Sequence, residues 1–203
     1  MWNLESMNDI CAIILAAGES KRMKVPKMLL PYEDKTIIEK VIENIISSGI
    51  KNVKVVLGSW SDDILKVTCN MSVTNCYNED FMKGMLSSVK CGFGNLDDKC
   101  KAALLFLGDQ PGIKPDVIKN LIEAYRKSGK GIIMPMFNNK RGHPLIIDCK
   151  YRDEIAGLDQ SGTLRDLVHK HPDDVLEIEV RSESVLKDID TQEDYLNELK
   201  QIK

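Results

Sequence analysis

Short apolar runs alternate along the chain with longer segments in which apolar residues recur every three or four positions. The runs are typical of strands buried on both faces of a sheet, and the segments are typical of helices that pack one face on it. This alternation predicts a single α/β domain over residues 1–203, with parallel pairing of its strands. Strands are expected at residues 10–16, 53–57, 72–77, 101–107, 131–136 and, at an edge, 175–180, and helices at 36–48, 60–67, 82–91, 115–128, 164–169 and after Thr191.

Composition limits the classes of partner. The chain has 203 residues, 43% hydrophobic and 29% charged, which excludes global disorder and allows a substantial core. Its net charge of -3 gives no electrostatic basis for nucleic-acid binding, so a nucleotide partner is expected to be a free triphosphate. No apolar run approaches the ~20 residues of a membrane helix, and residues 1–5 lack the features of a signal peptide. We therefore expect a cytoplasmic protein with no membrane or nucleic-acid partner.

The cysteines are scattered without a CxxC pair, and several lie in apolar, strand-like runs. Their spacing supports neither a zinc site nor a disulfide framework, and a cytoplasmic location agrees with reduced thiols. Buried free thiols are expected at Cys11, Cys69, Cys76, Cys91, Cys100 and Cys149.

Cations concentrate directly after the first strand. The strand ends at Ala17-Gly18, and Ser20, Arg22 and Lys27 follow, with further lysines at positions 21 and 24. A glycine lets the backbone approach a ligand, and backbone N–H groups together with cations suit a phosphate. An ordinary solvated turn has a similar composition, and the spacing is neither GxGxxG nor GxxxxGK[ST]. Composition alone leaves both interpretations open.

Two acidic segments are candidates for a metal site. Asp109 follows the buried strand at 101–107, at the position where open α/β sheets bind ligands, and its carboxylate suits Mg²⁺. Asp188 and Asp190 would complete such a site if their segment returns to the same cleft. The alternative for all three aspartates is a role in turns and helix caps.

Two further segments carry polar groups with alternative roles. Gly84, Ser87 and Ser88 lie near a helix start, where they offer hydroxyl and N–H groups to a base or phosphate, or cap the helix. His143 lies in a polar turn, where a lone histidine is most often incidental. We treat it as a contact candidate and not as a catalytic base.

Five segments, in order, resemble the motifs of one family. Residues 15–27 resemble the LAAGxSxRMGxxK signature of the small nucleotidyltransferases of the molybdenum cofactor cytidylyltransferase type, which are MobA-like, although Lys24 stands where that family usually has glycine. Residues 78–88 (NxxFxxGMxSS), 108–111 (GDQP), 142–144 (GHP) and 188–195 (DIDTxxDY) resemble the family's other motifs. The residues that match the first motif are Leu15, Ala16, Ala17, Gly18, Ser20, Arg22, Met23 and Lys27.

The resemblance implies a Rossmann-like three-layer α/β sandwich with a mostly parallel central sheet, of the nucleotide-diphospho-sugar transferase type. It implies that Arg22, Lys27 and Asp109 are catalytic, and that Asp109 binds Mg²⁺ with Asp188 or Asp190, of which we favour Asp188. The nucleotide-binding residues implied are Leu15, Ala16, Ala17, Gly18, Ser20, Lys27, Gly84, Ser87, Ser88, Gly108 and Asp109, and those on the acceptor side are Gln110, Pro111, Gly142, His143 and Pro144.

The reaction implied is transfer of CMP from CTP to the phosphate of molybdopterin cofactor, with release of pyrophosphate. Ala17, where guanylyl-transferring relatives usually carry glycine, favours cytidine. The resemblance also implies transient contact with a molybdenum hydroxylase or its chaperone. The alternatives are a related enzyme that uses GTP or acts on a sugar phosphate or methylerythritol phosphate, and a non-catalytic chaperone that carries the cofactor.

Overall fold

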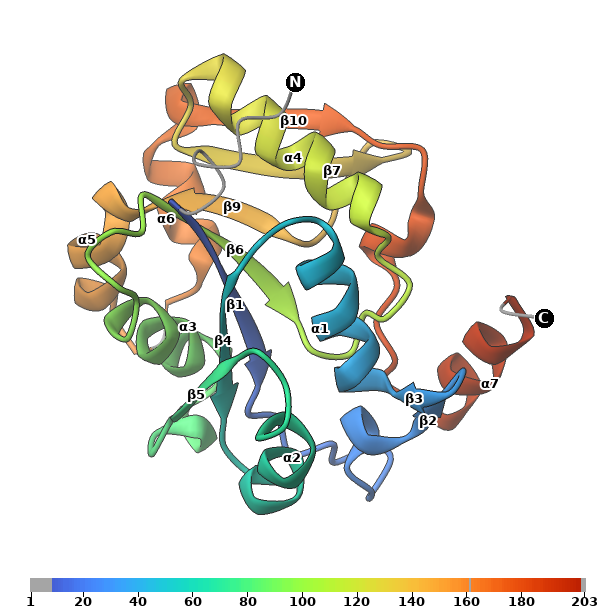
Figure 1. The fold of residues 1–203 in the computed structure, drawn as a ribbon. Coiled ribbons are helices and arrows are strands. Elements are labelled where there is room, and N and C mark those ends of the chain that lie inside the picture. The colour runs from blue at the N-terminus through green and yellow to red at the C-terminus, as the bar shows by residue number, and fades with distance from the viewer. Residues whose placement is uncertain (1–8, 161, 202–203) are drawn as a thin grey trace.

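The computed structural model describes residues 9–160 and 162–201 and shows a twisted sheet between two layers of helices (Figure 1). Most strand pairs are parallel, whereas β9 is antiparallel to both of its neighbours. The expected α/β sandwich with a mostly parallel sheet is confirmed. The strand order is β10 (Val175–Glu179), β7 (Ile132–Phe137), β9 (Leu145–Asp148), β6 (Ala102–Leu107), β1 (Ile10–Ala16), β4 (Asn52–Leu57) and β5 (Thr74–Tyr77), with β8 (Lys140–Arg141) paired to β7.

Each face of the sheet is covered by its own group of helices. One apolar core contains residues of α1 (Ile37–Ser47), α2 (Ser61–Thr68) and α4 (Pro115–Ser128). The other contains residues of α3 (Met85–Gly94), α5 (Arg152–Gly157) and α6 (Leu164–Lys170). Alternate residues of β1 point into the two cores, as Ile14 and Ile13 do, and every residue of β1 is buried. The continuous apolar sequence of β1 reflects this central position, because neither face of the strand meets water.

Helix α1 shows how the local sequence sets an element. Thr36 and Glu39 form a capping box that starts the helix, and Gly49 follows its end with φ 102°. The inward face of the helix is buried at Ile37, Ile38, Val41, Ile42 and Ile45, whereas Ile46 keeps 38% of its surface exposed. Consecutive helical residues are rotated by about 100°, so Ile46 points away from the sheet that Ile45 contacts.

The carboxyl-terminal helix α7 (Gln192–Gln201) packs against a small hairpin formed by β2 (Pro31–Tyr32) and β3 (Lys35–Thr36) (Figure 1). Thr191 caps this helix, which was predicted to follow it, by accepting a hydrogen bond from Asp194 N at 3.1 Å. The pattern of apolar residues did not predict the hairpin or α5. The two strands of the hairpin and α5 contain too few residues to show the periodicity of a strand or a helix.

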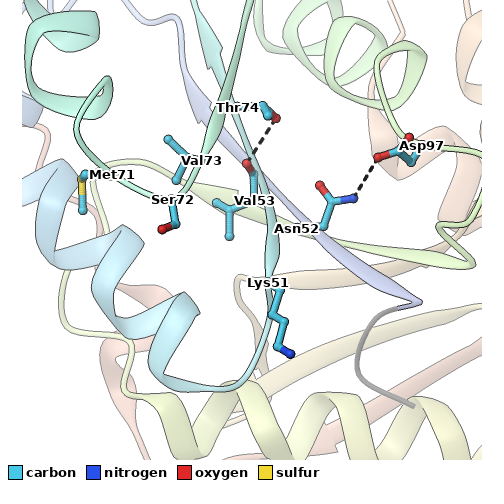
Figure 2. A pocket seen from close by; sticks show the side chains of 8 residues that line it. All are labelled: Lys51, Asn52, Val53, Met71, Ser72, Val73, Thr74 and Asp97. Atoms are coloured by element: carbon cyan, nitrogen blue, oxygen red, sulfur yellow. Dashed lines mark hydrogen bonds between the residues drawn. The ribbon is translucent and has the colours of Figure 1, made fainter. Parts of the chain in front are cut away.

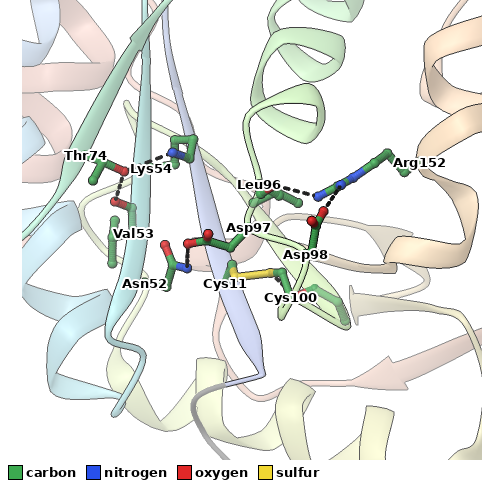
Figure 3. The surroundings of a disulfide bond; sticks show 11 residues. Cys11, Asn52, Val53, Lys54, Thr74, Leu96, Asp97, Asp98, Cys100 and Arg152 are labelled. Atoms are coloured by element: carbon green, nitrogen blue, oxygen red, sulfur yellow. Dashed lines mark hydrogen bonds and ion pairs between the residues drawn. A yellow bond between two sulfur atoms is a disulfide. The ribbon is translucent and has the colours of Figure 1, made fainter.

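The cysteine prediction is wrong in two respects, because two of the cysteines form a disulfide and the other four are not buried. Cys11 in β1 and Cys100, which precedes β6, are joined by a disulfide with a Cα–Cα distance of 6.0 Å (Figure 3). They lie 89 residues apart in sequence, and the pairing of β1 with β6 brings them together. The free cysteines are Cys69, Cys76, Cys91 and Cys149, of which Cys69 is exposed and the others are partly exposed.

No helix in the described part of the chain is long and apolar enough to cross a membrane. Residues 1–5, on which the expectation of no signal peptide rests, lie outside the described residues.

Candidate active site

Four charged side chains from distant parts of the chain meet beside the carboxyl end of β6. Lys27 Nζ lies 2.5 Å from Asp109 Oδ2 and 2.8 Å from Asp190 Oδ1. Arg22 Nη1 lies 2.6 Å from Asp190 Oδ2. Lys27 and Asp109 are each only 8% exposed. The structure therefore places together basic residues of the first loop and acidic residues of two later segments.

Strand order explains why the first loop meets Asp109. β1 and β6 are parallel neighbours with Leu15 opposite Leu107, so the loops that follow them leave the same edge of the sheet. Gly108 N donates to Leu15 O at 3.1 Å. A Cβ at Gly108 would lie 2.9 Å from Met28 Sδ and 3.0 Å from Leu15 O. Glycine at 108 thus allows the segment that carries Lys27 to pack against the end of β6.

The carboxyl-terminal segment adds two more carboxylates. Ile189 N donates to Asp109 O at 3.1 Å, which fixes this segment beside β6. One carboxylate oxygen from each of Asp109, Asp188 and Asp190 lies within 4.8 Å of the others. Asp109 Oδ1 is buried and has no hydrogen-bond partner among the described residues. Oxygen ligands in this number suit a hard divalent cation, so these residues fit Mg²⁺.

The electrostatics of the cluster follow from its burial. Burial raises the pKa of Asp109, and the Lys27 ammonium only partly offsets this effect. Burial would lower the pKa of Lys27, but Asp109 and Asp190 together raise it. The hydrogen bond from Lys27 lowers the pKa of Asp190. Lys27 is therefore a cation at neutral pH. The carboxylates of this cluster, Asp109, Asp188 and Asp190, outnumber its cations, Lys27 and Arg22.

The loop after β1 leaves space for a ligand. A Cβ at Gly18 would meet no atom within 4 Å. Ser20 and Lys24 adopt left-handed conformations, with φ 51° and 57°. Glycine takes this conformation without steric cost, which explains why a glycine suits position 24. Ala17 packs against Gly58, where a Cβ would lie 2.7 Å from Ala17 Cβ.

Leu15 and Ala16 were predicted to contact the nucleotide, but their side chains are buried in the sheet. Leu15 is 7% exposed and belongs to the core that contains α3 and α5, and Ala16 belongs to the opposite core. Their side chains therefore serve packing. They contribute to the site by placing the loop that begins at Ala17.

The segment expected to hold the nucleotide base is organised by Asn78, directly after β5. Asn78 is 5% exposed, and its Nδ2 donates to Ser87 Oγ at 2.8 Å and to Ser88 Oγ at 3.0 Å. Neither serine caps α3, whose N-cap is Gly84 with φ 99°. Asn78 and Ser87 line a pocket of about 400 Å³. This role of Asn78 was not predicted from the sequence, although its position at a strand's carboxyl end was a usable signal.

Gln110 and Pro111 extend the site beyond Asp109. Gln110 is 3% exposed, and its Oε1 has no hydrogen-bond partner among the described residues. Pro111 O accepts a hydrogen bond of 2.9 Å from Asn44 Nδ2 in α1. Gln110 therefore offers a buried acceptor, whereas Pro111 anchors the turn to α1.

The segment 142–144 reaches the same edge because β9 runs antiparallel to β6. His143 N donates to Val185 O at 2.8 Å, and a Cβ at Gly142 would lie 2.3 Å from the same oxygen. The peptide bond between His143 and Pro144 is cis. Burial lowers the pKa of His143 against the opposing influence of Asp188. The imidazole is therefore neutral at pH 7.

Another pocket, of about 330 Å³, lies at the other end of the strands, away from Lys27 and Asp109 (Figure 2). It is lined by residues at the amino ends of β4 and β5, such as Lys51 and Ser72. None of the residues predicted to be functional lines it.

Comparison with known proteins places the chain among nucleotidyltransferases. A family model described as "MobA-like NTP transferase domain" matches residues 12–175. The Bifunctional protein GlmU of Clostridium acetobutylicum is 34% identical over 141 residues, which are 68% of this chain and 31% of that protein. The chain thus spans about a third of the length of this relative.

Some relatives match almost the whole chain. The molybdenum cofactor cytidylyltransferase of Escherichia coli is 27% identical over 197 residues, which are 94% of this chain and 95% of that protein. The crystal structure of Rv0371c from Mycobacterium tuberculosis has a TM-score of 0.84 at 26% identity and covers 96% of this chain and 99% of that chain. A complex of Rv0371c with manganese has a TM-score of 0.80 at 25% identity, over 95% of this chain and 99% of that chain.

Proposed function

The chain belongs to the family of MobA-like NTP transferase domains, and we propose that it transfers CMP from CTP to the phosphate of molybdopterin cofactor. The products are pyrophosphate and molybdopterin cytosine dinucleotide. The name of the Escherichia coli relative, which matches the chain over nearly its whole length, supports this choice of substrates. A cytoplasmic location and a transient contact with a molybdenum hydroxylase or its chaperone belong to the same proposal.

The observation that carries the proposal is the Lys27 ammonium held between Asp109 and Asp190, with Arg22 beside it. Lys27 and Arg22 would bind the triphosphate and stabilise the negative charge of pyrophosphate as it leaves. An oxygen of the acceptor phosphate would attack the α-phosphorus, so no side-chain nucleophile is needed. The protein contributes alignment and charge neutralisation, which together account for most of the catalysis in phosphoryl-type transfer.

The three aspartates would hold Mg²⁺. Asp188 is the preferred partner of Asp109, because Lys27 and Arg22 already engage both carboxylate oxygens of Asp190. Bound there, the cation would neutralise phosphate oxygens and orient the α-phosphate. The manganese complex of the related Mycobacterium tuberculosis protein supports a divalent cation in this fold.

The remaining residues would position the two substrates. The Gly18 loop leaves room for the triphosphate. The pocket beside Asn78 and Ser87 lies beyond β4 on the same edge and would take the base. On the acceptor side, the buried Oε1 of Gln110 would accept a hydrogen bond, and the neutral His143 would contact the acceptor without acting as a base.

Pyrophosphate release measures the proposed reaction directly. The protein is incubated with each of the four nucleoside triphosphates, Mg²⁺ and one acceptor at a time: molybdopterin cofactor, a sugar phosphate or methylerythritol phosphate. We expect release with CTP and molybdopterin cofactor. Release of pyrophosphate only with a sugar phosphate would contradict molybdopterin cofactor as the acceptor. Release only with GTP would contradict CTP as the donor.

A matched pair of variants separates the enzyme from a cofactor-carrying chaperone. Asp109→Asn removes the charge that would bind the cation, and we expect it to abolish turnover. Asp173→Asn changes an exposed carboxylate next to the amino end of β10, at the opposite edge, and should keep full turnover. Cofactor binding without turnover by the unmodified protein would support the chaperone, and undiminished turnover of Asp109→Asn would remove Asp109 from the site.

A further inference from the structure

Two of the free cysteines face one another between β5 and α3. Cys76 Sγ in β5 lies 3.9 Å from Cys91 Sγ in α3. Both residues are partly exposed, contrary to the expectation of buried thiols, and Cys91 lines the pocket of about 400 Å³ beside α3. A disulfide needs a sulfur–sulfur distance of about 2.0 Å, so the two sulfurs must approach by about 2 Å.

We propose that Cys76 and Cys91 form a reactive dithiol site that a low-molecular-weight anionic disulfide, such as oxidised glutathione, converts into an intramolecular disulfide. The site is distinct from the cluster around Lys27 and needs neither nucleotide nor metal. It cross-links the same two elements that Asn78 joins by its hydrogen bonds to Ser87 and Ser88.

The surroundings of the two sulfurs give them different roles. The hydrogen bond with Cys76 lowers the pKa of Cys91 to about 7, burial opposes this effect, and Lys54 assists it. The pKa of Cys76 is raised by the hydrogen bond with Cys91 and by burial. Cys91, which lines the pocket whereas Cys76 does not, is therefore the attacking thiolate, and Cys76 is the resolving thiol.

The pocket favours an anionic reagent. Lys83 and Lys90 line it together with Cys91, and Asp80 is the carboxylate among the lining residues. Lys83 forms an ion pair with Asp80 at 2.9 Å, which offsets its charge. Lys90 instead donates to the backbone carbonyl of Leu158, and this neutral partner leaves its positive charge in place. The carboxylates of oxidised glutathione would thus meet positive charge near the reacting sulfur.

The reaction balances as two thiol–disulfide exchanges. In the first, Cys91 Sγ⁻ attacks one sulfur of the reagent, breaks its S–S bond and expels one thiolate, which takes up a proton. In the second, Cys76 loses its proton to solvent and attacks Cys91 Sγ, and the second small thiol leaves. The two protein thiols are oxidised, and one reagent disulfide is reduced to two thiols.

The test treats the whole 203-residue chain, with its four free cysteines reduced and without nucleotide, with oxidised glutathione at pH 7 and maps the products by peptide mass spectrometry. We expect a Cys76–Cys91 cross-link in the unmodified protein. Cys76→Ser should stop at a glutathione adduct on Cys91. Cys69→Ser is the matched control, because Cys69 is an exposed cysteine at the end of α2, and it should form the cross-link as the unmodified protein does.

Rates supply a second readout that does not depend on any variant. We expect Cys91 to react with the reagent about threefold or more faster than Cys69, because Lys90 lines the same pocket and attracts an anionic reagent, and because its lowered pKa makes Cys91 partly a thiolate at pH 7. The proposal is overturned if Cys91 reacts no faster than Cys69, if no Cys76–Cys91 peptide forms, or if Cys76→Ser accumulates no adduct on Cys91.

Discussion

At the scale of single residues, Lys27 holds a place that a bound cation would take. Its ammonium contacts Asp109 and Asp190, two of the three carboxylates that would bind Mg²⁺. A cation that binds without nucleotide must compete with this ammonium. The triphosphate would offer Lys27 a new partner and so favour cation binding.

The substitution Lys27→Met tests this competition. Without nucleotide, we expect the variant to bind Mn²⁺ about tenfold more tightly, which corresponds to about 1.4 kcal/mol. Electron paramagnetic resonance of free Mn²⁺ at pH 8 measures the affinity. Arg22→Met is the control, because Arg22 is mostly exposed and contacts only Asp190 of this cluster, so its effect should be smaller. Equal or weaker Mn²⁺ binding by Lys27→Met would contradict the competition.

Lys24 is strained by its left-handed conformation, with φ 57°. We expect Lys24→Gly to raise the free energy of unfolding by up to about 1 kcal/mol, because relief of the Cβ clash outweighs the added entropy of the unfolded chain. Lys21→Gly, in the same exposed loop but without positive φ, should lower it by about 0.5–1 kcal/mol. Urea denaturation measures the change in the free energy of unfolding, which should have opposite signs in the two variants. A loss of stability in Lys24→Gly would show that the backbone at Lys24 is not strained.

At the scale of elements, helix α7 and the hairpin of β2 and β3 support the segment that carries Lys27. Tyr195 OH donates to Pro31 O at 2.6 Å, and Tyr32 OH donates to Glu198 at 3.0 Å. Tyr32, Ile37, Ile189 and Tyr195 form a small apolar cluster around these bonds. The helix thus joins the segment of Asp190 to the segment of Lys27.

Removal of one hydroxyl tests this support. Tyr195→Phe should lower the free energy of unfolding by about 1 kcal/mol, because the Pro31 carbonyl loses its partner in a partly buried place. Tyr77→Phe is the control, because Tyr77 is 53% exposed, and it should stay within about 0.5 kcal/mol of the unmodified protein. Equal stability of the two variants would show that α7 does not depend on this bond.

The sequence located the long elements well and the short ones poorly. The predicted helix at 115–128 coincides with α4, and Ile10–Ala16 coincides with β1. The helix predicted at 82–91 begins later, at Met85, because Phe81–Lys83 forms a short 3₁₀ helix and Gly84 turns the chain. A segment of two or three residues has too few positions to show a period, so tertiary contacts decide its structure.

At the scale of the whole molecule, ligand binding should be visible as stability. At a CTP concentration about a hundredfold above its dissociation constant, binding with Mg²⁺ adds about 2.7 kcal/mol and raises the melting temperature by about 5–10 °C. Differential scanning fluorimetry with each triphosphate measures this shift. Asp109→Asn should lose most of it, and a larger shift with GTP than with CTP would contradict the proposed base.

Sequence alone predicted the residues of the Lys27 cluster but not the contacts among them. Arg22, Lys27, Asp109 and Asp190 each belong to a motif that resembles a family pattern. Their convergence depends on the placement of β1 beside β6 and on the bond from Ile189 N to Asp109 O. The disulfide between Cys11 and Cys100 arises from the same pairing, and spacing in sequence carried no sign of it.

The amino-acid sequence by itself determined where the longer strands and helices form, because the periodicity of apolar residues and helix capping depend on a few neighbouring residues. It also determined which charged groups the loops carry. The tertiary structure alone decided that Asn78 organises Ser87 and Ser88, that Lys27 is shared by two carboxylates, and that Cys76 faces Cys91. Such contacts join residues that are far apart in the chain or lie on different elements. Strand order and helix packing set their distances, and no local pattern records them.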